Sequence, residues 1–284
     1  MKDFKLGIIV DSFRKDFKTN VEIAKELGAD GIQMYMVEGE LAPENMTPEK
    51  IAEVKQILSD NALEISAVCA DLGGHGFARA EDNPQKIATS KRIAEIAKEL
   101  GATVLTTHIG VIPEDKTCER YQVMQAACKE LGTYAEEQGM FFAIETGPEK
   151  AIILKEFLDS LDCKGMAVNL DPANFIMVAD QDPVEAVHLL KDYIVHTHAK
   201  DGIMLQKTDP NIIYDFFADG GIGDLRLGDY FLETPLGEGK VDFDAYLAAL
   251  REIGFHGYLT IEREVGPDPV ADVKMAMDLL RSKL

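Results

Sequence analysis

Four side chains that commonly bind divalent cations end four successive apolar runs in the second half of the chain. The runs FFAIE, AVNLD, IVHTH and YLTIE end at Glu145, Asp171, His198 and Glu262, respectively. Three carboxylates and one imidazole form a hard, oxygen-rich donor set that suits Mn²⁺, Mg²⁺ or Co²⁺, and Zn²⁺ is a further candidate. Any one of these residues could instead cap a helix or end a strand in solvent. Their recurrence in adjacent runs indicates a single metal site, and we expect Mn²⁺ to be its preferred ion.

Three further histidines are candidates for binding a substrate. Side chains alternate between the faces of a strand, so His196 shares a face with His198. His196 could contact the substrate, support the ligand from behind, or be a hydrogen-bonded core residue. His108 ends another run, VLTTH, and we expect it to contact the substrate. His75 stands in the glycine-rich segment DLGGHGF, where a mobile polar contact with the substrate is expected.

Two charged residues near these runs have alternative interpretations. Lys200 could bind a sugar oxygen or a carboxylate, or it could pair with Asp201 on the surface. Glu264 shares a face with Glu262 and is an alternative ligand, or it pairs with Arg263 on the surface. The substrate contacts that we predict are His75, His108, His196 and Lys200.

Eight short apolar runs, rich in β-branched residues, alternate with amphipathic stretches of helical spacing. The heptapeptide IAKELGA occurs twice, at 23–29 and 96–102, and each copy is followed at once by an apolar run. Gly28 and Gly101 stand where each helix should end, because glycine adopts the left-handed conformation without a Cβ clash. The apolar runs span residues 6–10, 31–36, 65–69, 104–108, 141–145, 166–171, 193–198 and 258–262.

This alternation predicts an α/β fold, a single (β/α)₈ TIM barrel that spans residues 1–284 as one domain. A doubly wound open sheet is the alternative, but it usually carries a glycine turn after its first strand, and the segment VDSFRKDF has none. In a barrel the C-terminal ends of the strands meet at one mouth, which would gather the four metal-binding candidates. Residues 202–239, after the seventh strand, are expected to form a long loop that serves as a lid or an interface.

The composition excludes several classes of function. Lys and Arg total 29 against 50 Asp and Glu, and the net charge of −21 argues against a nucleic acid partner. No apolar run approaches the roughly 20 residues of a membrane-spanning helix, and the opening MKDFKLGIIVDSF is unlike a secretory signal. The four cysteines lack metal-binding spacing, so we expect reduced thiols and a cytoplasmic location.

The segments HTHAKD (196–201) and GEGKVDF (237–243), with the strand endings above, resemble the xylose-isomerase-like TIM-barrel superfamily over essentially the whole chain. The chain looks most like the sugar-phosphate isomerase/epimerase family, which includes ketose 3-epimerases, hydroxypyruvate isomerases and inosose dehydratases. The resemblance implies that Glu145, Asp171, His198 and Glu262 bind one divalent metal. It also implies that Glu145 and Glu262 transfer protons on opposite faces of a keto-sugar through an enediolate. Members of the family are often homodimers or homotetramers.

Three departures from the ketose 3-epimerases affect substrate-contacting positions and leave the metal ligands intact. Asn174 stands where those enzymes carry a histidine, Met204 where they carry an arginine, and Ala151 where they carry a glutamate. The resemblance therefore implies a retained metal centre with a different set of substrate-contacting residues, and it does not carry over the specificity for free ketohexoses. The acidic composition favours an uncharged substrate over a sugar phosphate.

These observations predict a divalent-metal-dependent sugar isomerase or epimerase that acts on a ketose or a related keto-sugar. The alternative is a metal-dependent hydro-lyase acting on a keto-inositol or keto-sugar, since departure of a β-hydroxyl from the same intermediate is a dehydration. A metal-dependent phosphodiesterase would need more than the six histidines present and a basic face for DNA. A sugar-binding barrel without catalysis stays open, and it predicts a site indifferent to Glu145→Gln.

Overall fold

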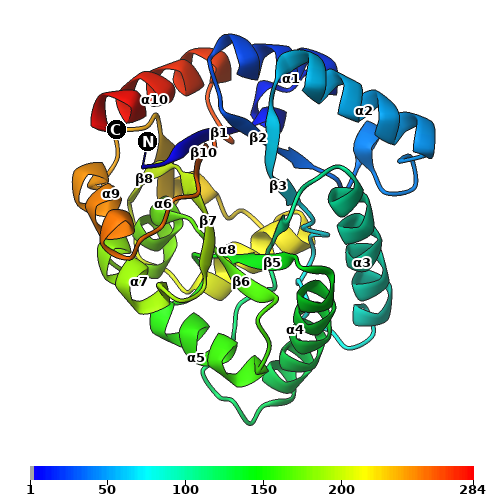
Figure 1. The fold of residues 1–284 in the computed structure, drawn as a ribbon. Helices are drawn as coiled ribbons and strands as arrows, with labels where there is room; N and C mark the ends of the chain where they lie inside the picture. Colours follow the sequence, from blue (N-terminus) through cyan, green and yellow to red (C-terminus); the bar gives the residue numbers. More distant parts are fainter. Residues whose placement is uncertain (1–2) are drawn as a thin grey trace.

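The computed structural model describes residues 3–284, which form a closed barrel of eight parallel strands (Figure 1). The strand order is β1-β10-β7-β6-β5-β4-β3-β2, and β1 closes the ring by pairing with β10. The predicted TIM barrel is confirmed, and this closure excludes the open sheet. The barrel strands are β1 (Lys5–Ile9), β2 (Gly31–Tyr35), β3 (Glu64–Cys69), β4 (Val104–Thr107), β5 (Phe141–Glu145), β6 (Met166–Leu170), β7 (Ile194–Ala199) and β10 (Tyr258–Ile261).

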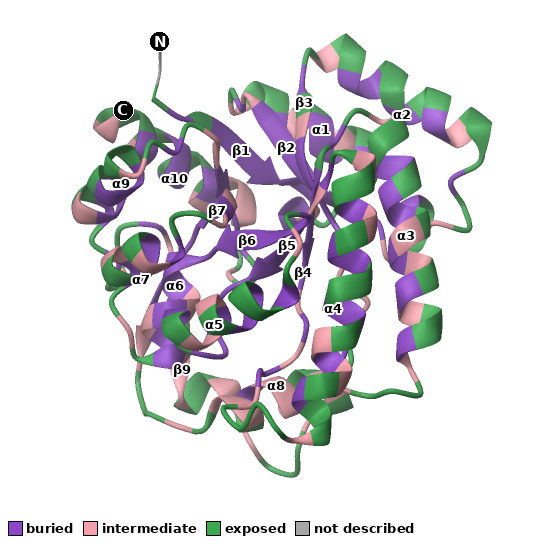
Figure 2. Ribbon diagram, turned by 60° about the horizontal axis from the view of Figure 1, so that its bottom comes forward, coloured by how far each residue is buried: buried purple, intermediate pink, exposed green. Residues whose placement is uncertain are grey.

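Helices surround the barrel, with their buried residues toward the strands and their outer faces exposed (Figure 2). The main helices are α1 (Phe17–Glu26), α2 (Pro48–Asn61), α3 (Asn83–Glu99), α4 (Glu119–Gln138), α5 (Ala151–Leu161), α7 (Pro183–Leu190), α9 (Phe243–Glu252) and α10 (Pro269–Lys283). Shorter helical turns are η1 (Val10–Phe13), η2 (Gly39–Leu41), α6 (Pro172–Asn174) and η3 (Phe175–Ala179). Within residues 3–284, no helix is long and apolar enough to cross a membrane.

The repeated heptapeptide ends two helices in the same way. Gly28 and Gly101 follow α1 and α3 with φ of +76° and +91°, in the left-handed region that favours glycine. The next residue, Ala29 or Ala102, donates its N–H to a carbonyl in the last turn of the helix, at 3.1 Å and 2.9 Å respectively. The chain then enters β2 or β4. The same local chemistry thus directs two helices back into the barrel.

A layer of buried polar side chains crosses the barrel just below its C-terminal mouth. Gln33, Thr106, Asn169, His196 and Thr260 come from five different strands, and none is more than 2% exposed. Hydrogen bonds join Gln33 to Thr106 and join His196 to both Asn169 and Thr260. Because side chains alternate along a strand, the residue two positions further on shares the same face and stands at the mouth. The polar layer is therefore a floor for the mouth.

Residues 202–239, predicted as a long loop, contain regular structure of their own. Strands β8 (Asp201–Met204) and β9 (Phe231–Thr234) pair antiparallel, and α8 (Pro210–Asp219) and η4 (Leu227–Asp229) lie between them. Asp209 caps α8 and Gly220 ends it in the left-handed conformation, so the helix carries ordinary start and stop signals. The Gly- and Asp-rich composition of the segment hid those signals.

Candidate metal centre

The four residues expected to bind a metal lie together at the mouth of the barrel. Glu145 ends β5, Asp171 follows β6, His198 lies in β7 and Glu262 follows β10. These four strands are consecutive neighbours in the closed sheet. One ligand atom from each residue lies within 4.8 Å of the others, and all four residues are buried.

Two carboxylate oxygens in this group lack a well-oriented hydrogen bond. Asp171 Oδ1 accepts the N–H groups of Ala173 and Asn174 at the start of α6, whereas Asp171 Oδ2 is buried without a hydrogen bond and lies 3.7 Å from His198 Nδ1. Glu262 Oε2 has no hydrogen bond of good geometry, although it lies 3.1 Å from both His198 Nδ1 and Lys200 Nζ. Burying a carboxylate oxygen without a partner is costly. The pair of oxygens and their hard-donor neighbours therefore fit a divalent cation.

Hydrogen bonds from the floor of the mouth fix the orientation of the His198 ring. His198 Nδ1 faces the carboxylates, 3.1 Å from Glu262 and 3.4 Å from Glu145. Nε2 faces the opposite way, 3.1 Å from Gln33 Oε1 and 3.1 Å from the amide nitrogen of Asn169. When Nε2 donates its proton to Gln33, Nδ1 is left with a lone pair that can bind a metal.

Two buried cations offset part of the charge of the three carboxylates. Burial alone would lower the pKa of His198, but Glu262 and Glu145 hold it well above its ordinary value. Burial would likewise lower the pKa of Lys200, and Glu262 and Glu264 hold it well above its ordinary value. Burial would raise the pKa of Glu262, yet Lys200 and His198 lower it below its usual value. A bound divalent cation would take over the role of the His198 proton.

His196 lies behind the metal-binding group and outside the cavity above it. Its Nδ1 lies 2.9 Å from Asn169 Oδ1 and its Nε2 lies 2.9 Å from Thr260 Oγ1. Burial and the charge of His198 lower the pKa of His196 well below its ordinary value, so the ring is neutral. Of the three roles considered from the sequence, this position fits support of the ligand from behind, and the expected substrate contact does not fit it.

A cavity of about 260 Å³ opens above the metal-binding group, and we call it the reaction cavity. Glu145 and Glu262 line it, as do His75, His108 and Lys200, three of the four expected substrate contacts. Residues of α8 and β9 complete its wall, so the segment 202–239 contributes directly to the site.

The two cavity histidines each contact carboxylates. His108 Nδ1 lies 2.8 Å from Asp71 Oδ2. Burial alone would lower the pKa of His108, but Glu145 and Asp71 raise it to about 10, so the ring carries a positive charge at neutral pH. His75 lies 3.4 Å from Asp215 and 3.1 Å from Asp219, both on α8. The DLGGHGF segment thus contacts the helix that covers the cavity.

The surface ion pairs considered for Lys200 and Glu264 are wrong. Lys200 is only 4% exposed and lies 3.1 Å from Glu262 and 2.5 Å from Glu264. Asp201 is instead buried, and its carboxylate accepts the N–H groups of Gly202, Gly237, Gly239 and Val241 at 2.8–3.1 Å. Arg263 pairs with Glu233 and Asp272, so Glu264 is free to pair with Lys200. The barrel mouth therefore buries Lys200, Asp201 and Arg263, whereas the Glu264 side chain remains 56% exposed.

The three departures from the ketose 3-epimerases occupy different positions in the structure. Asn174 lines the reaction cavity and donates from its amide nitrogen to Glu145 Oε1 at 3.3 Å. Met204 lies on β8 and Ala151 starts α5, and neither lines the cavity. Only the Asn174 departure therefore touches the metal-binding group.

Several residues at this site had not been identified from the sequence. Gln33 and Asn169 interrupt apolar runs at positions that share a face with the strand end, and this parity is a signal that could have found them. Tyr214 and Glu233 line the cavity from α8 and β9. No periodic pattern in the sequence points to these two, because their place depends on how the segment folds back over the barrel.

Comparison with known proteins gives one family match and a set of similar barrels. The model of the family described as xylose isomerase-like TIM barrel matches residues 21–283. An uncharacterised protein of Methanocaldococcus jannaschii, MJ1311, is 24% identical over 199 residues, which is 66% of this chain. The chain spans only 59% of the length of that relative.

Solved structures of similar fold cover nearly the whole chain. A xylose isomerase domain protein from Planctomyces limnophilus has a TM-score of 0.80 and 25% identity, over 99% of this chain and 96% of that one. A D-tagatose 3-epimerase-like protein has a TM-score of 0.74 and 21% identity, over 99% and 98%. A probable 3-DHS dehydratase, AsbF from Bacillus anthracis, has a TM-score of 0.72 and 21% identity, over 98% and 99%. The last two likenesses concern the fold alone.

Proposed function

Since the chain belongs to the xylose isomerase-like TIM barrel family, we propose that it is a divalent-metal-dependent sugar isomerase or epimerase acting on a ketose or related keto-sugar. The observation that carries the proposal is the placement of Glu145 and Glu262. They come from the ends of β5 and β10, both belong to the metal-binding group, and both line the reaction cavity. Two carboxylates that flank one bound substrate can remove and return a proton.

The residues that would hold the metal are Glu145, Asp171, His198 and Glu262, and Mn²⁺ is the ion that we propose. A divalent cation held there would stabilise negative charge on the oxygens of the bound sugar. Glu262, whose pKa is below its usual value, is ionised at neutral pH and can accept a proton from the carbon beside the carbonyl. Asn174 donates to Glu145 and holds that carboxylate toward the cavity.

Return of the proton decides the reaction. A proton returned by the opposite carboxylate to the same carbon inverts that centre, which is epimerisation. A proton delivered to the adjacent carbon of the enediolate gives aldose–ketose isomerisation. His108, Lys200 and His75 are the proposed substrate contacts, and the positively charged His108 ring can donate to a sugar oxygen in which negative charge develops.

A second candidate, a metal-dependent dehydratase, is favoured by the same charged histidine. His108 is held protonated in the reaction cavity, where it can donate a proton to a departing hydroxyl group. The product then has lost one water, whereas epimerisation and isomerisation leave the mass unchanged. Mass spectrometry of the product therefore separates the two candidates.

The proposal is tested by turnover of a panel of ketoses, keto-inositols and their phosphates in deuterated water, with Mn²⁺ supplied. Deuterium should enter the substrate at a carbon beside the carbonyl. Glu145→Gln and Glu262→Gln should each lower the exchange rate by at least about 100-fold, because each removes a proton-transferring group. An exposed glutamate, Glu44, provides the matched control, and Glu44→Gln should leave exchange unchanged. Full activity after thorough chelation, or normal exchange in both cavity variants, would refute the proposal.

A further inference from the structure

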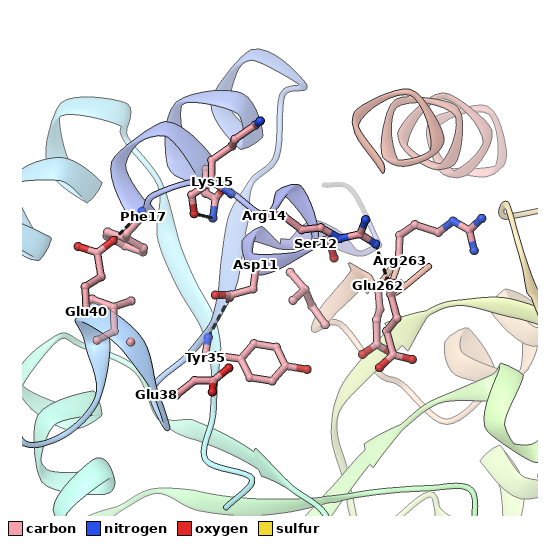
Figure 3. Close-up of a pocket in the computed structure, with 15 residues that line it drawn as sticks. Asp11, Ser12, Arg14, Lys15, Phe17, Tyr35, Glu38, Glu40, Glu262 and Arg263 are labelled. Atoms are coloured by element: carbon pink, nitrogen blue, oxygen red, sulfur yellow. Dashed lines mark hydrogen bonds between the residues drawn. The ribbon is translucent and has the colours of Figure 1, made fainter. Parts of the chain in front are cut away.

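A second cavity, of about 460 Å³, lies beside the reaction cavity (Figure 3). Its walls come from η1, the start of α1, the connection from β2 to η2, and the end of β10. Tyr35, Glu262 and Glu264 line both cavities, so a side chain of the metal-binding group faces each of them. The Tyr35 ring extends toward Glu262 (Figure 3). The two cavities are therefore adjacent at Glu262.

Some polar groups of the second cavity are already engaged in the fold. Glu40 accepts the Phe17 N–H at 2.8 Å and pairs with Lys50. Arg14 donates to the Glu264 carbonyl at 2.8 Å. Asp11 accepts the Tyr35 N–H at 2.9 Å through one carboxylate oxygen. These contacts hold the wall together and leave the remaining polar groups to a ligand.

Three side chains of the wall are available to a ligand. Ser12, Lys15 and Glu38 line the second cavity, and none of their side chains has a hydrogen bond or ion pair within residues 3–284. They offer a hydroxyl, an ammonium and a carboxylate, which together can donate to and accept from sugar hydroxyl groups. Tyr35, which lines both cavities, adds an aromatic ring.

The charges of the wall suit a neutral group. Two of its carboxylates already pair with a lysine outside the wall, Glu264 with Lys200 and Glu40 with Lys50. Asp11 and Glu38 add two negative charges, and Lys15 and Arg14 add two positive charges, because the cited partner of Arg14 is an uncharged carbonyl. These four charges offset one another, so a neutral polyol placed here needs no further counter-charge.

We propose that the second cavity binds a neutral sugar unit attached to the reacting keto-sugar, so that the substrate class is a keto-disaccharide or keto-glycoside. The inference rests on the proposed function for the placement of the reacting unit. Cavity size agrees with it: the reaction cavity, at about 260 Å³, is smaller than the roughly 300–1,000 Å³ typical of small-molecule sites. The two cavities together accommodate a two-unit sugar.

The experiment compares one-unit and two-unit ketoses on the metal-loaded protein. Solvent deuterium exchange is measured with D-fructose and with the ketose disaccharides maltulose, lactulose and isomaltulose. At least one disaccharide should have a kcat/KM about tenfold above that of D-fructose. Ser12→Phe, which fills the second cavity, should reduce kcat/KM for that disaccharide by about tenfold and change D-fructose turnover by less than about twofold. Glu38→Ala removes one acceptor and should act in the same direction by about threefold, while Glu44→Ala, outside the cavity, should have no effect.

A binding measurement separates failure of this inference from failure of the proposed function. Maltitol and sorbitol, which lack the carbonyl, are titrated into the same proteins by calorimetry. Tighter binding of maltitol than of sorbitol, lost in Ser12→Phe, supports the second sugar site even if no ketose exchanges deuterium. Exchange with D-fructose but no preference for any disaccharide, and equal binding of the two polyols, would overturn the inference and leave the proposed function standing. Equal losses on both substrate classes in Ser12→Phe would also overturn it.

Discussion

Replacing Asp171 by asparagine should stabilise the protein without a metal and weaken its stabilisation by one. Asp171 Oδ1 caps α6 through two N–H groups, whereas Asp171 Oδ2 is buried beside two other carboxylates with no hydrogen-bond partner. Asparagine keeps an oxygen for the cap. It also removes one of three negative charges that are balanced by only two cations, His198 and Lys200.

The size of both effects follows from the environment of Asp171 Oδ2. Leaving a buried polar group unpartnered costs about 1–3 kcal/mol, so metal-free Asp171→Asn should gain about that much in free energy of unfolding. For a chain of this length, 1 kcal/mol corresponds to about 2 °C in Tm. With Mn²⁺ at about 100 times the wild-type Kd, the wild type gains about 2.7 kcal/mol. If the variant binds about 100-fold more weakly, it gains only about 0.4 kcal/mol.

The assay is thermal and urea unfolding of both proteins with a chelator and with Mn²⁺. Asp201→Asn is the matched control, because Asp201 is equally buried but both of its oxygens accept N–H groups. That variant should lose about 1–3 kcal/mol in both conditions and keep the full metal-induced gain. The reasoning is refuted if Asp171→Asn behaves like Asp201→Asn, with lower stability in both conditions and an unchanged response to Mn²⁺.

Three further predictions concern residues around the site. Gln33→Leu removes the acceptor for His198 Nε2 and should weaken Mn²⁺ binding about 10–100-fold by calorimetry, whereas an unchanged Kd would show that the ring needs no such support. Burial raises the pKa of Glu149 from 4.5 to about 8, so the folded chain keeps a proton that the unfolded chain releases above about pH 4.5. The free energy of unfolding should therefore fall by about 2–4 kcal/mol as pH rises from 4.5 to 8. Urea unfolding at several pH values should show a weaker pH dependence for Glu149→Gln than for the wild type, and the same pH dependence in both proteins would contradict the prediction. A Cβ at Gly7 would lie 2.5 Å from Thr260 Oγ1, so Gly7→Ala should lower Tm by several degrees. A Cβ at Gly39 would meet nothing within 4 Å, but its φ of +67° is left-handed, so Gly39→Ala should lower Tm through backbone strain alone and leave Mn²⁺ affinity unchanged.

The fold and the metal-binding group could be predicted because both depend on local repetition. Each strand carries its own apolar run, each helix its own glycine stop, and the strand ends Glu145 and Asp171 take their places once the barrel closes. Gln33 and Asn169 could also have been predicted, because residues two positions apart on a strand share a face with the strand end. The partners of Lys200 and Glu264 could not be predicted, because they depend on long-range packing at the mouth, which buries Lys200 and leaves Glu264 exposed beside it.

The segment 202–239 shows a different limit of sequence reasoning. Its helix has an aspartate cap and a glycine stop, but β8 and β9 are only four residues each and pair with one another outside the barrel. Tyr214 and Glu233 reach the reaction cavity through this arrangement, and neither residue stands in a periodic pattern that marks the site. The barrel strands do not constrain residues that come from a segment of this kind. The identity of such residues can therefore vary most freely among barrels of one family.

The charges of the two cavities explain why a neutral substrate agrees with an acidic chain. The net charge of −21 repels an anionic ligand through the electrostatic field of the whole protein, but it does not describe the charges at the site itself. The reaction cavity opposes it locally, because each of its basic side chains already has a protein partner. Lys200 pairs with Glu262 and Glu264, His108 with Asp71, His75 with Asp215 and Asp219, and Arg120 donates to the Val111 carbonyl at 2.7 Å. A phosphate group would have to displace one of these contacts, and it would then face the carboxylates that were left. A neutral sugar needs no such exchange, since its hydroxyl groups can donate to the carboxylates and accept from the cations in their present positions.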